Sequence, residues 1–467
     1  MKCWSSKNSE ILIFSTRYKY TTNNVMACAI FASLNSVLLG YDVGVMSGAI
    51  LFIQKDLKIT EVQEEILVGI LSIISLLGSL AGGKTSDAIG LFAGIGIGFG
   101  IMIAPVYIAE ISPTVSRGSL TSFPEISVNF GILLGYVSNY AFSGLPAHIS
   151  WRIMLAAGIL PSVFIGFALF VIPESPRWLV MQNRIEEARM VLLKTNENAS
   201  EIEERLAEIQ QAASFVNAGK YEDRAVWRDL LNPSPGVRRM LITGCGIQIF
   251  QQITGIDATV YYSPTVFKDA GIQDEAQLLA ATVAVGFTKT IFILIAIFLI
   301  DKAGRKPLLY VSTIGMTACL FTLGLTLSTL GDGKLGIGMA IVCVCGNVAF
   351  FSVGIGPVCW VVSSEIFPLK LRAQASAIGA VGSRVSSGLV AMSFLSVCRA
   401  VTVGGTFFVF AAISALSVAF VYKCVPETKG KSLEQIEMLF QNDRAWEGNE
   451  VELEDMEHKH LMQSSES

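Results

Sequence analysis

Several polar or amphipathic side chains lie inside long apolar stretches of this chain, where they are costly and therefore informative. They are Asp42, Gln251, Gln252, Asp257, Lys289 and Trp360. A charged side chain in the middle of a membrane-spanning helix costs about 2.5–3.5 kcal/mol on insertion scales and usually faces a cavity. A buried carboxylate can carry a proton, and an amide both donates and accepts hydrogen bonds, which suits a ligand with several hydroxyl groups. These residue types therefore predict a polar cavity for a proton and a polyhydroxy molecule.

Some of these residues also have an interpretation that needs no ligand. Asp42 stands near one end of its apolar stretch, where an acid can lie at the membrane interface. Gln251 and Gln252 cannot both face the same side of a helix, whereas Gln248, Gln252 and Gly255 share one face. Amides on such a face can serve hydrogen bonds between helices instead. Both interpretations stay open at the level of the sequence.

Lys289 and Trp360 have alternatives of the same kind. An unpaired lysine in lipid is costly, and Asp257 is the nearest acid in the same half of the chain, so we expect an Asp257–Lys289 pair lining the cavity. Lys289 can instead pair elsewhere or extend to the interface. Trp360 follows Gly356-Pro357, a break that loosens a helix. Its indole can stack on a sugar or lie at the lipid interface.

The composition is that of a membrane protein. Of 467 residues, 52% are hydrophobic and only 15% are charged, whereas a soluble domain carries about 25% charged residues. Apolar runs long enough to cross a bilayer recur along the chain, and helices are the expected spans. We predict eleven, at about 25–48, 66–83, 90–109, 124–142, 153–172, 240–264, 279–300, 307–329, 336–362, 376–397 and 401–425.

A charged signature occurs once in each half of the chain, with unequal spacing. The later copy, Asp301-Lys-Ala-Gly-Arg-Lys306, is complete, whereas the earlier copy, Ser86-Asp-Ala-Ile-Gly90, stops without its basic pair. The aspartate of the earlier copy lies 23 residues before Glu110, and that of the later copy lies 64 residues before Glu365. Landmarks further on keep nearly equal spacing. The chain therefore resembles a duplicated protein that lacks 41 residues, the difference between 64 and 23, close to Gly90.

Two helical halves are expected on either side of a polar linker. The linker carries many arginines next to span ends, and positive loops stay cytoplasmic. Two copies of a multi-span unit around a shared centre are the architecture of secondary transporters. The predicted domains are a cytoplasmic N-terminus, a truncated five-span half, a cytoplasmic linker with amphipathic helices, a six-span half and a cytoplasmic tail with a disordered end. Their ranges are 1–24, 25–172, 173–239, 240–425 and 426–467.

At this point the motifs resemble those of the sugar porter family of the major facilitator superfamily. The motifs are Gly40-Tyr-Asp-Val-Gly-Val-Met-Ser-Gly48, Pro173-Glu-Ser-Pro-Arg-Trp178, Gln251-Gln252, Gly255-Ile-Asp257, Asp301-Lys-Ala-Gly-Arg-Lys306, Gly356-Pro-Val-Cys-Trp360, Ser364-Glu-Ile-Phe-Pro368 and Pro426-Glu-Thr-Lys-Gly-Lys-Ser432. Within that family the chain looks most like plant polyol/monosaccharide–proton symporters. Gly135-Tyr-Val-Ser-Asn-Tyr140 and Gly255-Ile-Asp257 carry the narrower likeness. The resemblance implies an all-α major facilitator fold, here with about eleven spans instead of twelve.

The resemblance also implies roles for the polar residues. It makes Asp42 the proton-coupling residue, and it makes Gln251, Gln252 and Trp360 substrate contacts. Relatives place an arginine opposite the acid, and in this chain that position is Gly90. Without this cation the charged form of the acid is less stabilised, so it releases its proton less easily. We expect a poor or inactive symporter.

Two positions bear on the substrate within the same resemblance. Ile132 stands where glucose-type relatives use glutamine, which favours polyols over hexoses. Ser383 stands where polyol-type relatives usually carry asparagine, so a ligand contact there is in doubt.

A second group of charged residues sits at predicted cytoplasmic span ends. We expect them to form an ion-pair gate that breaks as the halves rock; for the basic members, topology alone is the alternative. The predicted gate residues are Asp87, Glu110, Arg117, Glu174, Arg177, Asp301, Gly304, Arg305, Glu365 and Arg372.

The missing segment creates a topological conflict. The second span should end in the cytosol, and the next predicted span, 91–109, begins almost at once. In the family, the C-terminal end of this span also lies in the cytosol. One span cannot begin and end on the same side of the membrane. Either 91–109 enters without crossing, or the rest of the first half inverts, or the product is degraded. The positive linker resists inversion, so a badly packed first half is the favoured outcome.

The overall prediction is a plasma-membrane, multi-pass transporter of sugars or polyols that works by alternating access. It is proton-coupled in full-length relatives, and the alternative is a non-transporting sensor or regulatory isoform. The expected partners are a small-molecule sugar or polyol, a proton and the lipid bilayer. A net charge of −4 argues against nucleic acid. The sequence has no nucleophile–base pair and no metal cluster, so no enzyme, cofactor or metal is expected.

Overall fold

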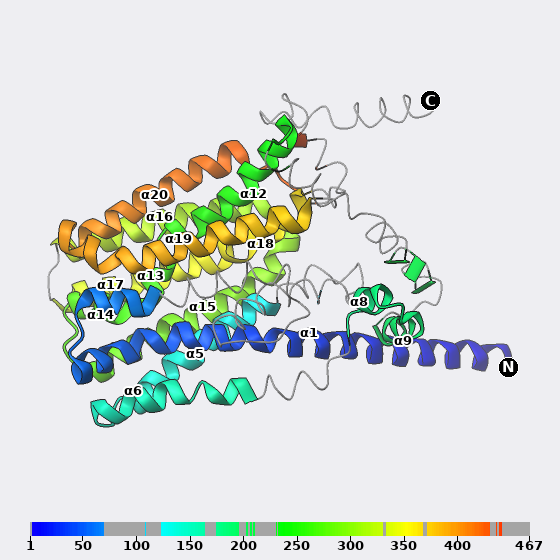
Figure 1. Ribbon diagram of the computed structural model, residues 1–467, viewed down its shortest axis with the longest axis horizontal. Coiled ribbons are helices and arrows are strands. Elements are labelled where there is room, and N and C mark those ends of the chain that lie inside the picture. Colours follow the sequence, from blue (N-terminus) through cyan, green and yellow to red (C-terminus); the bar gives the residue numbers. More distant parts are fainter. Residues whose placement is uncertain are drawn as a thin grey trace. The chain divides into compact units, whose positions relative to one another are not determined.

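The structure is a computed structural model that describes most of the chain. The described residues are 2–69, 108, 123–163, 174–195, 202, 203, 206, 207, 209, 210, 230, 232–329, 333–367, 371–429, 436, 439 and 440. Their regular structure is helical (Figure 1). The chain forms two compact units. Unit 1 comprises Met1–Asp223, Val260–Lys268 and Ile272–Ile291; unit 2 comprises Arg224–Thr259, Asp269–Gly271 and Phe292–Ser467.

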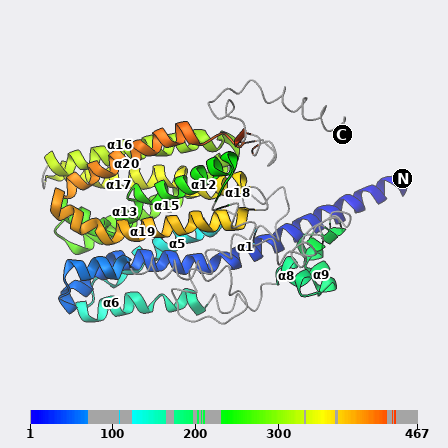
Figure 2. The ribbon, with the colours of Figure 1, turned by 45° about the horizontal axis from the view of Figure 1, so that its top comes forward.

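Unit 1 is built around the long helix α1 (Lys2–Leu57), which packs along α5 (Phe123–Phe142) and α6 (Ala147–Ala156) (Figure 2). Small residues let the backbones of α1 and α5 come very close, as is common between helices in lipid. A Cβ atom on Gly40 would lie 1.9 Å from the carbonyl oxygen of Val128. The Tyr41 hydroxyl donates a 2.6 Å hydrogen bond to the Met154 carbonyl and thereby ties α6 to α1.

Unit 1 also contains a segment from the second half of the sequence. This segment includes α14 (Ser263–Asp269) and the first part of α15 (Glu275–Ala303). The Tyr136 hydroxyl donates a 2.8 Å hydrogen bond to the Val260 carbonyl. Near the C-terminal end of α1, Lys55 forms an ion pair with Glu275 at the start of α15. Part of the second half is therefore attached to helices of the first half.

The region between the halves contains two short helices, α8 (Pro176–Met181) and α9 (Ile185–Thr195). Ser175 caps α8 by accepting a 3.5 Å hydrogen bond from the backbone N–H of Trp178, and a proline occupies the first turn. Both helices bury an apolar face in one cluster that includes Leu179, Ala188 and Leu192. On α9, exposed charged side chains such as Glu186 and Arg189 lie away from this cluster, as expected for a helix outside a membrane.

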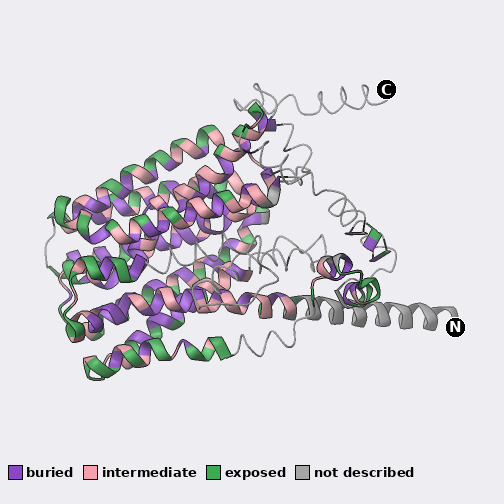
Figure 3. Ribbon diagram, in the orientation of Figure 1, coloured by how far each residue is buried: buried purple, intermediate pink, exposed green. Residues whose placement is uncertain are grey.

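Unit 2 is a bundle of longer helices. They are α12 (Pro235–Ile253), α13 (Ile256–Tyr261, which ends within unit 1), α16 (Arg305–Thr329), α17 (Lys334–Val353), α18 (Ile355–Ile366), α19 (Arg372–Val401) and α20 (Val403–Cys424). Helix α12 packs on α18, α19 and α20, and α16 packs on α17, α18 and α20. Figure 3 shows buried and exposed residues on the same helices. Large apolar side chains such as Tyr422 (70% exposed) and Val342 (65% exposed) lie on the surface, where lipid can cover them.

Two predicted spans are broken rather than continuous. The span expected at 240–264 is divided at Gly255, which has φ +84. The span expected at 336–362 is divided at Gly354, two residues before the predicted break. A Cβ atom on Gly354 would lie 2.3 Å from Ser312 of α16, and the Ser312 hydroxyl accepts a 3.0 Å hydrogen bond from the Ile355 N–H. The neighbouring helix thus both requires the glycine and supplies the freed N–H with an acceptor.

Six helices in the described residues are long and apolar enough to cross a membrane. They are Cys28–Leu57, Glu275–Ile300, Arg305–Thr329, Lys334–Ser363, Gln374–Val401 and Val403–Cys424. They match six of the eleven expected spans. Helix α5 covers the expected span at 124–142, and most of those at 66–83 and 90–109 lies outside the described residues. The total of eleven stays a prediction.

The close contact between α1 and α5 can be tested by adding one methyl group. Gly40→Ala should destabilise the folded chain by about 1–3 kcal/mol, because the new Cβ atom meets backbone that cannot rotate away. The thermal unfolding midpoint in detergent measures the loss. Gly144→Ala is the control, since nothing lies within 4 Å of its Cβ position. Equal midpoints for the two variants would contradict the close packing.

Candidate functional site

Three glutamines on α12 form a ladder of amides inside unit 2. Gln248, Gln251 and Gln252 are 0%, 3% and 7% exposed. Each uses its amide nitrogen as a donor to a neighbouring helix. Gln248 donates to the Ser363 hydroxyl at 2.9 Å, Gln251 to the Gly356 carbonyl at 3.1 Å and Gln252 to the Ser383 hydroxyl at 3.3 Å. The ladder therefore ties α12 to both α18 and α19.

The other atom of each amide is left over. The Oε1 atoms of Gln248, Gln251 and Gln252 are buried and accept no hydrogen bond from any part of the chain that the structure describes. A buried acceptor without a donor costs about 1–3 kcal/mol. Three such acceptors on one helix are suited to a ligand that brings several hydroxyl donors. The glutamines thus serve helix–helix hydrogen bonding with their nitrogens, whereas their buried oxygens have no partner among the described residues.

Asp257 continues this polar set on α13. It is half-buried, and its Oδ2 atom accepts a short hydrogen bond from the Ser387 hydroxyl of α19. The predicted partner, Lys289, is only 7% exposed and lies on the part of α15 that belongs to unit 1, whereas Asp257 belongs to unit 2. The Asp257–Lys289 pair stays a prediction.

Trp360 lies on α18, one turn after Gly356, and is half-buried. Residues four apart share a face of a helix. The indole therefore lies on the same side of α18 as the residue whose carbonyl receives the Gln251 amide. This placement suits a side chain that stacks on a ligand held by the ladder.

Asp42 lies on α1 in unit 1 and is half-buried. Within the described part of the chain its carboxylate accepts no hydrogen bond and forms no ion pair. Gly90, the position at which relatives carry an arginine, lies outside the described residues. The structure therefore places Asp42 in an apolar helix without assigning it a cation.

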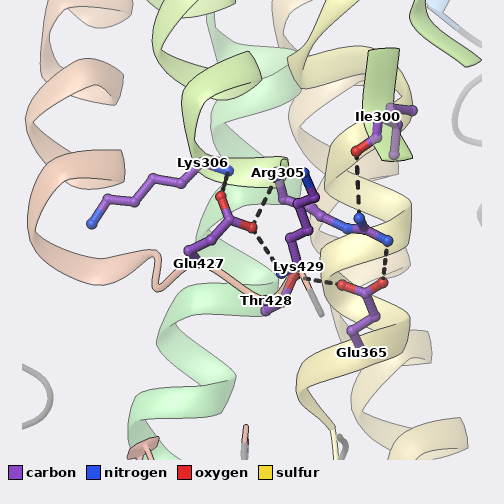
Figure 4. Close-up of polar contacts among 7 residues, drawn as sticks. All are labelled: Ile300, Arg305, Lys306, Glu365, Glu427, Thr428 and Lys429. Atoms are coloured by element: carbon purple, nitrogen blue, oxygen red, sulfur yellow. Dashed lines mark hydrogen bonds and ion pairs between the residues drawn. The ribbon is translucent and has the colours of Figure 1, made fainter. Parts of the chain in front are cut away.

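Two of the predicted gate residues, Arg305 and Glu365, belong to a polar network in unit 2 whose contacts Figure 4 shows. The Arg305 guanidinium donates to Glu365 Oε1 at 2.9 Å, and the Thr428 hydroxyl donates to Glu365 Oε2 at 2.6 Å. One carboxylate thus joins the start of α16, α18 and the segment after α20. The pair is only 14% and 24% exposed at its side chains, so solvent screens it less than a surface pair.

A second carboxylate in this network caps a helix. Glu427 accepts hydrogen bonds from the backbone N–H groups of Arg305 at 3.1 Å and Lys306 at 3.0 Å, at the N-terminus of α16. A negative charge is favourable there because the first N–H groups are unpaired and the helix dipole is positive. Gly304 makes room: it has φ +94, and a Cβ atom would lie 2.8 Å from Glu427 Oε2.

The structure describes only part of the predicted gate. Asp87, Glu110 and Arg117 lie outside the described residues, as do the side chains of Arg177, Asp301 and Arg372. Glu174 is exposed just before α8. Sequence reasoning did not assign Glu427 and Thr428 to the gate, although the motif that contains them repeats the position of Pro173-Glu174 in the first half. That repeat was the available signal.

The capping role of Glu427 is testable by removing its charge. Glu427→Gln should lower stability by about 1–2 kcal/mol, because an amide cannot accept from both N–H groups and carries no charge for the helix dipole. Thermal unfolding measures the loss, and hydrogen exchange at Arg305 and Lys306 should accelerate. Glu186→Gln on exposed α9 is the matched control. Unchanged exchange at the start of α16 would contradict the cap.

Comparisons with known proteins agree with this arrangement. The model of the sugar (and other) transporter family matches residues 91–440. "Probable polyol transporter 4" from Arabidopsis thaliana is 69% identical over 473 positions, covering 94% of this chain and 90% of the relative. "Polyol transporter 5" from the same plant is 46% identical over 469 positions, covering 90% and 87%.

Solved structures show the same fold. The major facilitator proton:xylose symporter XylE bound to 6-bromo-6-deoxy-D-glucose is 27% identical, with a TM-score of 0.73, and the match covers 90% of this chain and 100% of XylE. The inward open form of XylE from E. coli gives a TM-score of 0.71 at 28% identity, covering 89% and 99%. The predicted all-α major facilitator fold is thus confirmed. The chain belongs to the sugar transporter family and is a multi-pass membrane transporter rather than an enzyme.

Proposed function

We propose that this chain binds a polyol or monosaccharide and moves it across the plasma membrane by alternating access. The observation that carries the proposal is the set of three buried amide oxygens on α12 that no described group satisfies. Hydroxyl groups of a linear polyol or a sugar are donors of the right kind. Two of the relatives reported above are named as polyol transporters, which supports the polyol end of this class.

The proposed substrate site consists of Gln251, Gln252, Asp257, Lys289 and Trp360. The amides and the carboxylate offer acceptors, the lysine offers donors and the indole offers an apolar face. On α5, Ile132 is 2% exposed and offers no hydrogen bond where glucose-type relatives carry glutamine. This position supports a preference for polyols over hexoses.

Asp42 is proposed to be the residue that binds the coupled proton. The lipid bilayer is the other proposed partner, and no nucleic acid is proposed. A half-buried carboxylate in a spanning helix can take up a proton on one side and release it on the other. The XylE structure above is titled a proton:xylose symporter, which supports coupling in this fold. The predicted gate residues, with Arg305 and Glu365 at its centre, are proposed to hold one end closed in one state.

We also propose that about 41 residues are missing near Gly90. The match to the first relative runs over 473 positions, although 94% of this 467-residue chain is only about 439 residues, so about 34 positions face gaps in this chain. For the second relative, 90% of the chain is about 420 residues against 469 positions, an excess of about 49. These two values bracket 41. A chain without the arginine opposite Asp42 should bind substrate but couple protons weakly.

Substrate binding is tested with purified chain in lipid nanodiscs and a linear polyol, sorbitol, beside glucose. Isothermal titration should show sorbitol binding that Gln251→Leu and Gln252→Leu each weaken at least about tenfold, because a hydroxyl donor loses its acceptor. Thr329→Ala, at an exposed position of α16, is the control. Sorbitol affinity equal in wild type and both leucine variants would exclude the ladder as the binding site.

Coupling is tested separately in proteoliposomes. Sorbitol exchange should proceed without a pH gradient, an inward proton gradient should add little accumulation, and Asp42→Asn should remove what remains while leaving exchange within about twofold. Strong gradient-driven accumulation by the wild-type chain would refute the impaired coupling. Binding without any exchange would favour the second candidate, a sugar or polyol sensor, which the missing segment motivates.

A further inference from the structure

Two buried carboxylates lie at the first turn between spans, outside the site described above. After α1 ends at Leu57, a helix begins at Glu61 with a reciprocal cap: the Thr60 N–H donates to the Gln63 side chain at 2.9 Å, and the Gln63 N–H donates to the Thr60 hydroxyl at 3.4 Å. Glu64 and Glu65 follow and are only 5% and 3% exposed. Neither is needed for substrate binding or for the gate, and burying acids in this way is costly.

The groups around Glu64 come from two elements. Glu61 and Glu65 on its own helix repel its charge, and Lys268 at the end of α14 attracts it. Further charged groups of this region are Lys58 in the turn and the Lys55–Glu275 ion pair between α1 and α15. Glu64 precedes the predicted second span at 66–83, so it lies outside the membrane-spanning segments.

Helix α14 belongs to a segment of the second half of the sequence that is attached to the helices of the first half. By sequence, Val260–Lys268 and Ile272–Ile291 are part of the second half, yet they belong to unit 1 with the helices of the first half. The Tyr136–Val260 hydrogen bond, the 3.4 Å hydrogen bond from the Thr290 hydroxyl to the Asn129 carbonyl and the Lys55–Glu275 pair hold it there. By the predicted topology, this end faces away from the cytosol.

We propose that Glu64 is a second proton-binding site, separate from the transport cavity, whose protonation holds the α14 segment against the first-half helices. The ligand is the proton itself. Opening at this end would release α14 and expose Glu64 to water, and closing would bury it again. A proton bound at Glu64 removes a buried charge and its repulsion from Glu61 and Glu65, at the cost of the attraction to Lys268.

The balance of these effects favours the neutral form when the segment is closed. Burial, followed by repulsion from Glu61 and Glu65, raises the pKa of Glu64 from 4.5 to about 7, with Lys268 acting in the opposite direction. A group whose pKa is higher in the closed state takes up a proton on closing, so closure is favoured as pH falls and weakened as pH rises through about 7. Between pH 7.5 and 5.5 the closed-to-open ratio should rise on the order of tenfold.

The inference rests on the proposed function, because only a carrier that alternates would open here. The test therefore reads conformation rather than uptake. Nitroxide labels are attached at Val62 and Gln273, both exposed, through a genetically encoded keto amino acid, which leaves the nine cysteines in place. Electron–electron double resonance then measures the distance distribution in nanodiscs at pH 5.5, 6.5 and 7.5.

The wild-type chain should shift toward the short distance as pH falls. Glu64→Gln should give the short distance at all three pH values, and Lys268→Gln should move the midpoint to higher pH because it removes the attraction to the charged form. Glu64→Asp should keep a pH response and serves if the glutamine variant fails to fold. Glu186→Gln on exposed α9 should behave as wild type.

Two results would overturn the proposal: a wild-type distribution that is the same at all three pH values, or a Glu64→Gln variant that still responds to pH. A chain that shows the pH-dependent distance but neither binds nor moves sorbitol would overturn the proposed function and leave the Glu64 site standing. The two proposals therefore fail by different observations.

Discussion

The constraint behind most of this structure is that a polar group removed from water must find a partner inside the protein. In the α12 ladder each glutamine nitrogen donates a hydrogen bond to an acceptor on α18 or α19. The three glutamine oxygens accept no hydrogen bond from any described group. The hydrogen bonds of the amide nitrogens hold the helix bundle together. The amide oxygens are left with unused capacity to accept hydrogen bonds. On the proposed function, structural support and ligand recognition are divided between the nitrogen and the oxygen of each side-chain amide.

The same constraint explains where helices break and how they are repaired. At Gly354 the break leaves the Ile355 N–H without a helical acceptor, and the Ser312 hydroxyl of α16 supplies one. At the start of α16 the unpaired N–H groups receive the carboxylate of Glu427. In both places a glycine allows the approach, and a polar side chain far away in sequence completes it. Broken helices lining a cavity are expected in transporters for this reason.

The sequence predicted the fold class, the family and most long helices of the second half, because apolar runs and motifs are local features. It also grouped Arg305 with Glu365, which form an ion pair, while the gate that it predicted for them stays a prediction. It could not predict that Glu427 caps α16 or that Gln248 bonds to Ser363, because helical spacing gives the face of a residue and not its partner. The break at Gly354 rather than Gly356 depends on the close contact with Ser312, which no spacing reveals. Glu64 and Glu65 resemble ordinary surface acids in the sequence, and only packing shows that they are buried.

The positions of the polar groups also indicate which activities the proposed missing segment near Gly90 would affect. Recognition is proposed to depend chiefly on α12, α13 and α18, and their hydrogen bonds run between elements of the second half of the sequence. Proton coupling is proposed to depend on Asp42, whose counter-charge in relatives stands where this chain has Gly90. A loss confined to the first half therefore removes the cation that balances the acid, while the amide ladder keeps every partner that the structure gives it. On the proposed assignment, binding and coupling would be separable in this chain, because the residues proposed for them lie in different halves of the sequence.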